Sequence, residues 1–232
     1  MQIAGSTALV TGAGRGLGRH FVRALLDRGA AKVYASTRTP VEIDGAIPLA
    51  LDVTDPASIA AAATAAPDVT LLINNAGIAS FTDLVTGDLA AIRHEMETNF
   101  FGPLQMIRAF APGLADGAVL NVLSALSWAT YRGSAGYAAS KSAAWSLTNS
   151  VRLELREQRT QVSGLVMAST DTDMMAGFDI PKNDPADIVR AALDGLEAGE
   201  IEIVADADSA AVKAGLSAHP TVLYPELLSP VG

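Results

Sequence analysis

Ser6-Thr-Ala-Leu-Val-Thr11 runs directly into Gly12-Ala-Gly-Arg-Gly-Leu-Gly18, and this stretch decides the fold. Its first half is a short apolar run typical of a buried strand, and its second half is rich in glycine. Leu17, Phe21 and Leu25 then recur at four-residue steps, which predicts a helix. A strand, a glycine loop and a helix in this order favour a dinucleotide site, with a pyrophosphate at the helix N-terminus. A glycine-rich turn that binds nothing has the same local pattern.

Strands and helices alternate along the rest of the chain. This alternation predicts an α/β fold: a Rossmann-like, doubly wound parallel sheet in three layers. Because no repeat or linker interrupts it, we expect a single domain over residues 1–232. The expected strands are 6–11, 31–37, 47–51, 69–73, 118–123, 161–167 and an edge strand at 200–204. The expected helices are 57–66, 88–111 with a kink at Gly102-Pro103, 134–158, one after Pro185 and one from Ser209, before an irregular segment over 220–230.

The composition excludes several classes of function. The net charge of −9 leaves no basic surface for nucleic acid or an anionic membrane. The chain has no cysteine, and His20, His94 and His219 lie far apart, so we expect no metal site. No apolar run approaches the ~20 residues of a membrane span, and the first residues do not form a signal peptide pattern. We therefore expect a cytoplasmic enzyme or binding protein.

Polar residues follow the predicted strands at their carboxyl ends. Asp52, Asn74, Ser124 and Thr170 each come directly after an apolar run or a few residues beyond it. Ligands of open α/β sheets bind in the crevice at these strand ends. The glycine loop ends the first strand, so it is predicted to lie at the same edge.

The strand over 31–37 indicates which dinucleotide fits. An NAD site usually has a carboxylate here for the ribose 2′-hydroxyl, but this chain has Ser36-Thr37-Arg38. Arg38, with Arg15 of the glycine loop, offers two guanidinium groups to a 2′-phosphate. The pattern predicts a preference for NADP(H) over NAD(H), although an arginine at a strand end is often only solvated.

Tyr137 and Lys141 are four residues apart on a predicted helix, so their side chains share one face. A neighbouring ammonium is expected to lower the pKa of a phenol and make it a proton donor and acceptor near neutral pH. The hydroxyl of Ser124, at the end of a buried strand, meets this face if the fold brings them together. A tyrosine and a lysine at this spacing also commonly line a solvated helix face.

The segment from Thr170 to Phe178 follows the last long strand. Its methionines and Phe178 fit either a mobile lid over an apolar pocket or a short helix packed on the core. No arginine stands out as a clamp for a carboxylate. We expect a small apolar substrate, in a pocket formed by Ser124, Trp128, Met167, Met174 and Phe178.

These motifs together resemble the short-chain dehydrogenase/reductase family, over about residues 7–174. The glycine loop is similar to the family's TGxxxGxG motif, and Asn74-Asn75-Ala76-Gly77 to its NNAG strand end. Arg15 and Arg38 coincide with the basic positions of the NADP-preferring members. Together with the polar residues at the strand ends, the resemblance implies a set of cofactor-binding residues. They are Gly12, Gly14, Arg15, Gly16, Leu17, Gly18, Thr37, Arg38, Asp52, Val53, Asn75, Ala76, Gly77, Tyr137, Lys141, Thr170 and Thr172.

The resemblance also implies a catalytic tetrad of Asn99, Ser124, Tyr137 and Lys141, which transfers a hydride between NADP(H) and a carbonyl or alcohol. By analogy Asn99 holds a water that passes protons to Lys141, but a buried asparagine at a helix kink fits the same position. A sensor or scaffold of the same fold, without catalysis, is the alternative function.

The family also implies a homodimer or homotetramer built on the helices over 88–111 and 134–158. Their alanine- and leucine-rich faces fit a subunit interface and a monomer core equally well. Two departures stand out: Met167-Ala168 replaces the family's Pro-Gly, and Glu200-Ile-Glu-Ile replaces its threonine-glycine turn. These departures concern the nicotinamide side of the pocket and the C-terminal wall.

Overall fold

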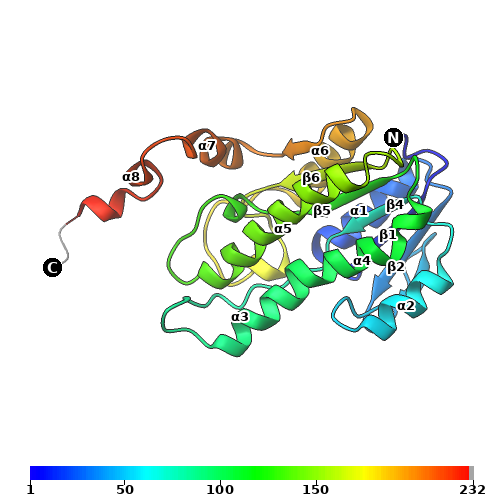
Figure 1. Ribbon diagram of the computed structural model, residues 1–232, viewed down its shortest axis with the longest axis horizontal. Coiled ribbons are helices and arrows are strands. Elements are labelled where there is room, and N and C mark those ends of the chain that lie inside the picture. The colour runs from blue at the N-terminus through cyan, green and yellow to red at the C-terminus, as the bar shows by residue number, and fades with distance from the viewer. Residues whose placement is uncertain (230–232) are drawn as a thin grey trace.

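The computed structural model describes residues 1–229 and is built on one parallel sheet of seven strands (Figure 1). The strands lie in the order β3-β2-β1-β4-β5-β6-β7. The order reverses between β1 and β4, which is where doubly wound sheets open a crevice. The predicted α/β class is therefore confirmed. The strand bounds are β1 Thr7–Thr11, β2 Lys32–Thr37, β3 Ile47–Ala50, β4 Leu71–Asn74, β5 Ala118–Val122, β6 Gln161–Val166 and β7 Glu202–Val204.

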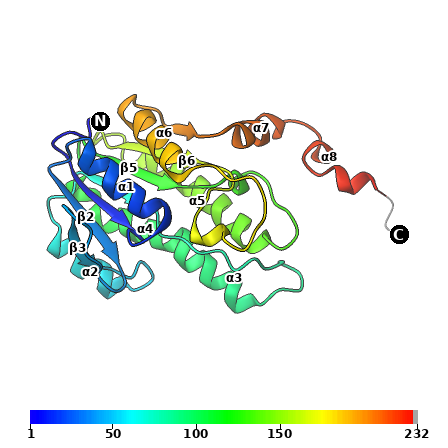
Figure 2. The same cartoon turned by 180° about the vertical axis from the view of Figure 1, so that it is seen from behind.

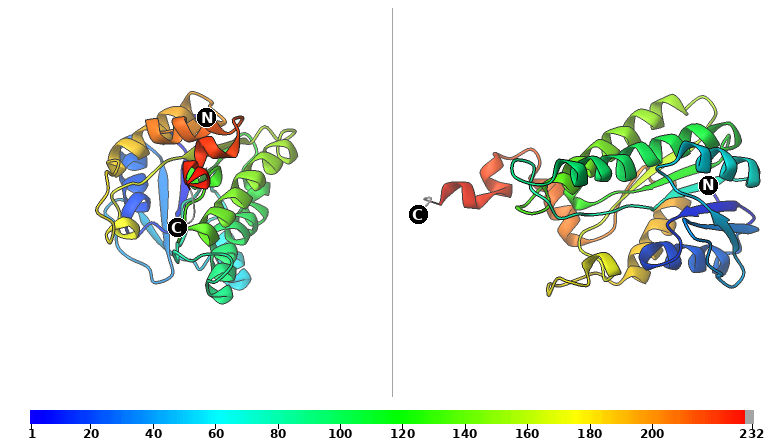
Figure 3. Two further views of the ribbon diagram at one scale, coloured as in Figure 1. Left: turned by 90° about the vertical axis from the view of Figure 1, so that its left-hand side faces the viewer. Right: turned by 90° about the horizontal axis from the view of Figure 1, so that it is seen from below.

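Helices cover both faces of the sheet, which makes three layers (Figures 2 and 3). On one face lie α1 (Gly16–Asp27) and α6 (Pro185–Glu197). On the other lie α2 (Pro56–Ala65), α4 (Gly102–Phe110) and α5 (Ala135–Glu154). The shorter α3 (Leu89–Met96) precedes α4 along the chain.

Each central strand is apolar on both faces because both faces are covered. Successive side chains of a strand point to opposite faces. Thus Val10 packs with α1 and α6, whereas its neighbour Leu9 packs with the helices of the other layer. The pairs Ile73 and Leu72, and Leu120 and Val119, divide in the same way.

A buried polar chain connects the sheet to α5. The Asn74 amide donates to the side-chain oxygen of Asn121 at 2.8 Å, and the Asn121 amide donates to the Thr148 hydroxyl at 2.9 Å. Thr148 in turn donates to the Ala144 carbonyl at 2.7 Å. Buried polar groups of this kind specify one arrangement, because leaving any one unpaired is costly. The chain therefore fixes α5, the helix of Tyr137 and Lys141, against β4 and β5.

The predicted helix over 88–111 is interrupted before the expected position. Between α3 and α4, Glu97–Phe101 form a π-helical turn in which the Gly102 N–H donates to the Glu97 carbonyl. Pro103 has no N–H and cannot continue a regular ladder, and the π-helical turn lies directly before Gly102-Pro103. Asn99 lies within this turn, and such turns are frequent at functional sites.

The C-terminal part also differs from the prediction. The edge strand β7 and a helix near Ser209, α7 (Ala207–Gly215), are confirmed, but α5 ends at Glu154. The expected irregular segment forms α8 (Pro220–Leu223) and a 3₁₀ turn (Pro225–Leu228), and residue 230 lies outside the described residues. Instead of wrapping around the domain, α8 and this turn project from it as an arm (Figures 1 and 3). Among residues 1–229, no helix is long and apolar enough to cross a membrane.

Candidate active site

A cavity of about 700 Å³ runs along the carboxyl ends of the strands. Asp52 after β3 and Ser124 after β5 both line it, and the sheet order places three strands between theirs. At ~4.8 Å per strand, these two ends are about 19 Å apart, so the cavity is elongated. Most of the predicted residues line it: Gly12, Gly14, Arg15, Gly16, Leu17, Thr37, Arg38, Asp52, Val53, Asn75, Ala76, Gly77, Ser124, Tyr137, Lys141, Met167, Thr170, Thr172 and Met174.

The glycine loop forms the floor of the cavity near β1. Gly12 has a φ of +66°, and a Cβ there would lie 3.0 Å from the Ala76 Cα. A Cβ at Gly18, which does not line the cavity, would collide with the Gly12 carbonyl oxygen. The loop therefore needs glycine at both positions, one for its turn and one for the approach of α1. The α1 N-terminus begins at Gly16, beside the cavity, where its unpaired N–H groups suit an anion.

Hydrogen bonds hold the glycine loop to the end of β4. The Thr11 hydroxyl oxygen accepts the N–H groups of Asn75 at 3.0 Å and Ala76 at 2.9 Å. The Asn75 amide donates to the Thr11 carbonyl at 2.8 Å and to the Gly12 carbonyl at 3.3 Å. The cradle is therefore held together by the protein's own hydrogen bonds.

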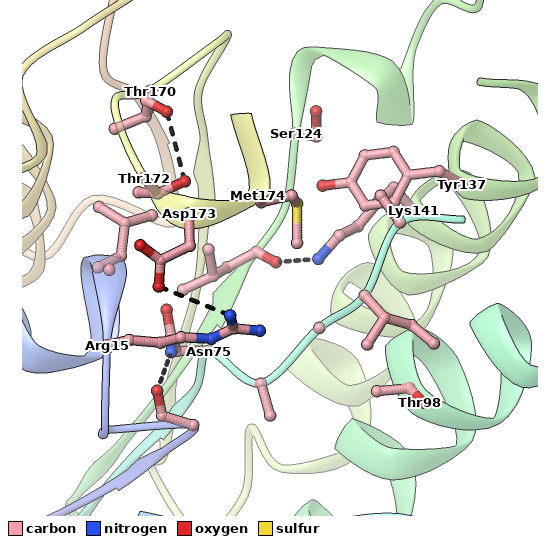
Figure 4. A pocket seen from close by; sticks show the side chains of 18 of the residues that line it. Arg15, Asn75, Thr98, Ser124, Tyr137, Lys141, Thr170, Thr172, Asp173 and Met174 are labelled. Carbon is pink, nitrogen blue, oxygen red and sulfur yellow. Dashed lines mark hydrogen bonds and ion pairs between the residues drawn. The ribbon is translucent and has the colours of Figure 1, made fainter. Parts of the chain in front are cut away.

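Charged groups collect where β2 and β3 end. Hydrogen bonds from the Thr54 N–H at 2.9 Å and the Thr54 hydroxyl at 2.7 Å lower the pKa of Asp52. Nearby Arg38 and His94 lower that pKa further. Arg38 is exposed and lines the cavity, whereas Arg15 forms an exposed ion pair with Asp173 at 3.6 Å (Figure 4).

Three side chains meet near the end of β5: Ser124, Tyr137 and Lys141 (Figure 4). The Ser124 Oγ accepts the Leu126 N–H at 3.1 Å, which leaves its proton free to donate toward Tyr137 and the cavity. The Lys141 Nζ donates to the Val122 carbonyl at 2.8 Å and lies 5.7 Å from the centre of the Tyr137 ring. A phenol, a hydroxyl and an ammonium therefore share one end of the cavity.

The pKa of Tyr137 is raised, whereas the sequence predicted that it would be lowered. Burial raises it to about 12, the Ser124 hydroxyl opposes this rise, and Tyr131 and Glu95 add to it. Burial also lowers the pKa of Lys141 to about 8. The expectation that Lys141 lowers the pKa of Tyr137 fails here because desolvation dominates both groups and the ammonium is bonded to a backbone carbonyl. Tyr137 thus keeps its proton at neutral pH.

Asn99 lies behind the cavity rather than in its lining. Its side chain accepts the Ile78 N–H and donates to the Ile78 carbonyl, both at 2.9 Å. It also donates to the Ser140 hydroxyl at 2.9 Å. A Cβ at Gly77 would lie 3.2 Å from the Asn99 Oδ1 and 3.6 Å from the Lys141 Nζ, so both atoms face this glycine. The structure thus brings Asn99 near Lys141 and also gives it a structural task at the π-helical turn.

Two residues predicted for the substrate pocket lie outside the cavity lining. Trp128 packs on the buried cluster that contains Leu123, with the Lys213 ammonium 5.5 Å from its ring. Phe178 packs on Phe81, with 4.8 Å between ring centres. Sequence reasoning missed these lining residues: Ile78, Ala79, Phe81, His94, Leu126 and Tyr131. Ile78, Ala79 and Phe81 directly follow the NNAG motif, which was the signal available for them.

Comparisons with known proteins agree with this geometry. The short chain dehydrogenase family matches residues 6–182. Carbonyl reductase (NADPH) 2 of Sus scrofa is 32% identical over 176 residues, 71% of this chain and 72% of that protein. D-erythrulose reductase of Gallus gallus is 32% identical over 186 residues, 75% of each chain. A short chain dehydrogenase from Burkholderia cenocepacia, crystallised with NADP, is 40% identical with a TM-score of 0.93, over 99% of this chain and 100% of that one. The chain belongs to the short-chain dehydrogenase family, whose members are oxidoreductases.

The depressed pKa of Lys141 predicts how stability depends on pH. The folded protein binds this proton with a pKa of about 8, against 10.5 for an ordinary lysine. Between these values the unfolded chain holds more of the proton, so the free energy of unfolding rises with pH. Relative to Lys141→Met, the wild type should gain up to about 3 kcal/mol across this window. Urea denaturation of both proteins without cofactor measures the difference, and parallel pH profiles would contradict the burial of a titrating ammonium.

Proposed function

We propose that this protein is an NADP(H)-dependent oxidoreductase that reduces a ketone or aldehyde, or oxidises the corresponding secondary alcohol. The observation that carries the proposal is the meeting of Ser124, Tyr137 and Lys141 at one end of an elongated cavity whose middle is a glycine cradle. A hydroxyl, a phenol and a buried ammonium side by side suit the protonation of an oxygen.

The cradle residues indicate how a dinucleotide is held. The glycine loop and the α1 N-terminus suit the pyrophosphate. Asp52 and Val53 are assigned to the adenosine end, and Thr170 and Thr172 to the nicotinamide amide. Lys141, at the opposite end from Asp52, is assigned to the ribose that carries the nicotinamide. When bound, the nicotinamide ring supplies or accepts the hydride.

The chain's own residues complete the reaction by handling the proton. Ser124 donates a hydrogen bond to the carbonyl oxygen, and Tyr137 gives that oxygen its proton as negative charge develops there. The phenolate left behind lies near the ammonium of Lys141, 5.7 Å from the centre of its ring, and regains a proton from that side. Asn99, which faces Lys141 across Gly77, is assigned to the path by which this proton arrives. In the oxidation of an alcohol each of these transfers runs in reverse.

The walls around Ser124 and Tyr137 favour an uncharged substrate. Ala125, Leu126, Met167 and Met174 line the same cavity as Ser124 and Tyr137. Apolar walls bind a ketone or aldehyde by excluding water from it. We therefore assign to the site a small apolar carbonyl compound or the matching alcohol.

Tyr137→Phe removes the proton donor and keeps the ring. We expect a loss of at least ~10²-fold in kcat for carbonyl reduction, within the usual range for a general acid, with binding of NADPH nearly unchanged. The measurement is NADPH oxidation with a panel of ketones and aldehydes. The matched control is Tyr34→Phe. Tyr34 lies on β2 and its hydroxyl donates to Asp68, so this variant removes a phenol elsewhere and should keep its turnover. Near wild-type turnover in Tyr137→Phe would rule out its role, and cofactor binding without any turnover in the wild type would favour a sensor.

The cofactor preference rests on Arg38. This exposed guanidinium lines the cavity directly after β2, and no carboxylate ends that strand. A charge-assisted hydrogen bond to the 2′-phosphate contributes roughly 1.5–3 kcal/mol, and each 1.4 kcal/mol is about a factor of ten. Arg15 adds a second cation once it leaves Asp173.

We expect the wild type to favour NADPH over NADH by about 10- to 100-fold in kcat/KM, from one such contact. Arg38→Asp should abolish or invert this ratio, because it repels the phosphate and offers an acceptor to a 2′-hydroxyl. Arg23→Asp makes the same change of charge on the exposed side of α1, away from the cavity, and should keep the wild-type ratio. Equal use of both cofactors by the wild type would show that Arg38 does not face the ribose.

We further propose a homodimer or homotetramer. The faces that contain Ala144, Leu147 and Val151 pack in the core of the monomer, so they do not support an interface. Support comes from Leu153 on α5, which is 75% exposed, and from the projecting arm, where Leu228 is 73% exposed. Light scattering at micromolar concentration should give a mass of two or four chains, and a monomeric mass would reject the oligomer.

A further inference from the structure

Phe81 has a backbone conformation that an aromatic residue rarely adopts. Its φ is +53°, in the left-handed region, which is costly for a bulky side chain and persists only where the surroundings fix it. Within residues 1–229 two other non-glycine residues have a positive φ, Asp116 and Arg159, and neither lines the cavity. Phe81 does. Strain of this kind at a cavity wall indicates a functional constraint.

The residue before Phe81 is held by a buried carboxyl group. The Ser80 N–H donates to the Glu95 Oε1 at 2.6 Å, and Glu95 is completely buried. Among the described residues the other carboxyl oxygen, Oε2, has no hydrogen-bond partner. It lies against Gly136, where any side chain would displace it. A costly buried group therefore fixes the chain at Ser80 beside the start of α5.

The residues after Phe81 are held by the same part of the chain. The Thr82 carbonyl accepts the Gly136 N–H at 3.2 Å, and the Asp83 carboxylate accepts the Gly133 N–H at 2.6 Å. Gly136 directly precedes Tyr137. Phe81 is thus held on one side by Glu95 of α3 and on the other by Gly133 and Gly136, which precede the proposed proton donor.

The facing wall is the segment over 171–182, which is closed at its base. The Asn183 N–H donates to the Ser169 carbonyl at 2.8 Å, and the Asp171 N–H donates to the Asn183 carbonyl at 2.9 Å. Between these points Thr172, Met175 and Phe178 recur at three-residue steps and are partly buried, whereas the residues between them are exposed. One face of the segment therefore turns inward.

Phe178 is where this segment meets the clamped wall. Its ring centre lies 4.8 Å from that of Phe81, with the rings tilted by 54°, an arrangement that aromatic pairs favour. The segment has two long ion pairs, Asp173 with Arg15 at 3.6 Å and Asp171 with Lys182 at 3.9 Å. Both partners of the first pair and the carboxylate of the second are exposed to solvent. Such pairs contribute little, and the second joins two residues of the segment itself, so neither accounts for the hold of the segment on the wall at Phe81.

We propose that Phe81 and Phe178 form a ring pair that holds the segment over 171–182 against the wall at Ser80–Asp83 and limits the size of the substrate that fits beside Tyr137. Phe81 is its fixed member and Phe178 its movable one. The size limit rests on the proposed carbonyl reduction, whereas the ring contact does not. A small ketone fits with the rings in contact, and a bulky one requires them to part.

The size limit is tested with uncharged ketones of increasing bulk: acetone, cyclohexanone, acetophenone and benzophenone. Phe81→Ala and Phe178→Ala should each raise the ratio of kcat/KM for benzophenone to that for acetone by about tenfold. Because the two rings act as one contact, the double variant should add little to either single change. Phe178→Leu keeps apolar bulk without the ring and should give an intermediate ratio, which guards against a variant that fails to fold.

Phe101→Ala is the matched control. Phe101 pairs with Phe100 at 4.9 Å, similar to the proposed pair, but neither ring lines the cavity. This variant should leave the ratio at its wild-type value. An unchanged ratio in Phe81→Ala and Phe178→Ala, or the same increase in Phe101→Ala, would overturn the size limit.

A second readout does not depend on turnover. The chain has no cysteine, so Ile180→Cys, at an exposed position in the segment, accepts a nitroxide label specifically. Phe81→Ala in this background should increase the mobile fraction of the label's spectrum, and Phe101→Ala should not. An identical spectrum would overturn the ring contact. If the wild type reduces no ketone while the label responds as expected, the carbonyl reduction and its size limit are wrong and the ring contact stands.

Discussion

The structure depends on the joint between the ends of β1 and β4. There the Thr11 hydroxyl accepts two backbone N–H groups, and the Asn75 amide returns two bonds to the glycine loop. These strands are the neighbours at which the order of the sheet reverses, so their ends would otherwise open a gap. The joint fixes the glycine loop and the start of α1 on one side. On the other side it fixes Gly77, where an added Cβ would lie 3.2 Å from the Asn99 Oδ1 and 3.6 Å from the Lys141 Nζ. A single set of hydrogen bonds therefore positions both the cofactor cradle and the catalytic end.

Burial is the second constraint, and it acts on Tyr137 and Lys141 in opposite directions. It raises the pKa of the phenol to about 12 and lowers that of the ammonium to about 8, so each group is driven toward its neutral form. In the proposed reaction Lys141 returns a proton to Tyr137, and the Val122 carbonyl that accepts a hydrogen bond from the ammonium holds Lys141 in place.

Much of the fold could be predicted because its signals are local. The relevant patterns each consist of consecutive residues: apolar runs, the glycine loop and the polar residues after each strand. They predicted the sheet and the crevice at its strand ends correctly. What could not be predicted depends on contacts between distant segments. The pKa of Tyr137 depends on burial by several elements, Trp128 faces α7 instead of the cavity, and Phe81 is clamped by Glu95 and Gly133. The sequence shows that Pro103 lacks an N–H, but it does not show where along the helix the hydrogen bonds change, which is at Glu97–Phe101.

The most direct test of this account is a crystal structure of the protein with NADPH. The account predicts the pyrophosphate over the glycine loop at Gly12–Gly18, the 2′-phosphate against Arg38, and the nicotinamide beside Tyr137 and Lys141. The bonds between Thr11 and Asn75 should be unchanged, because the cradle is already formed. A cofactor bound with its nicotinamide at the Asp52 end, or outside the cavity, would contradict the account.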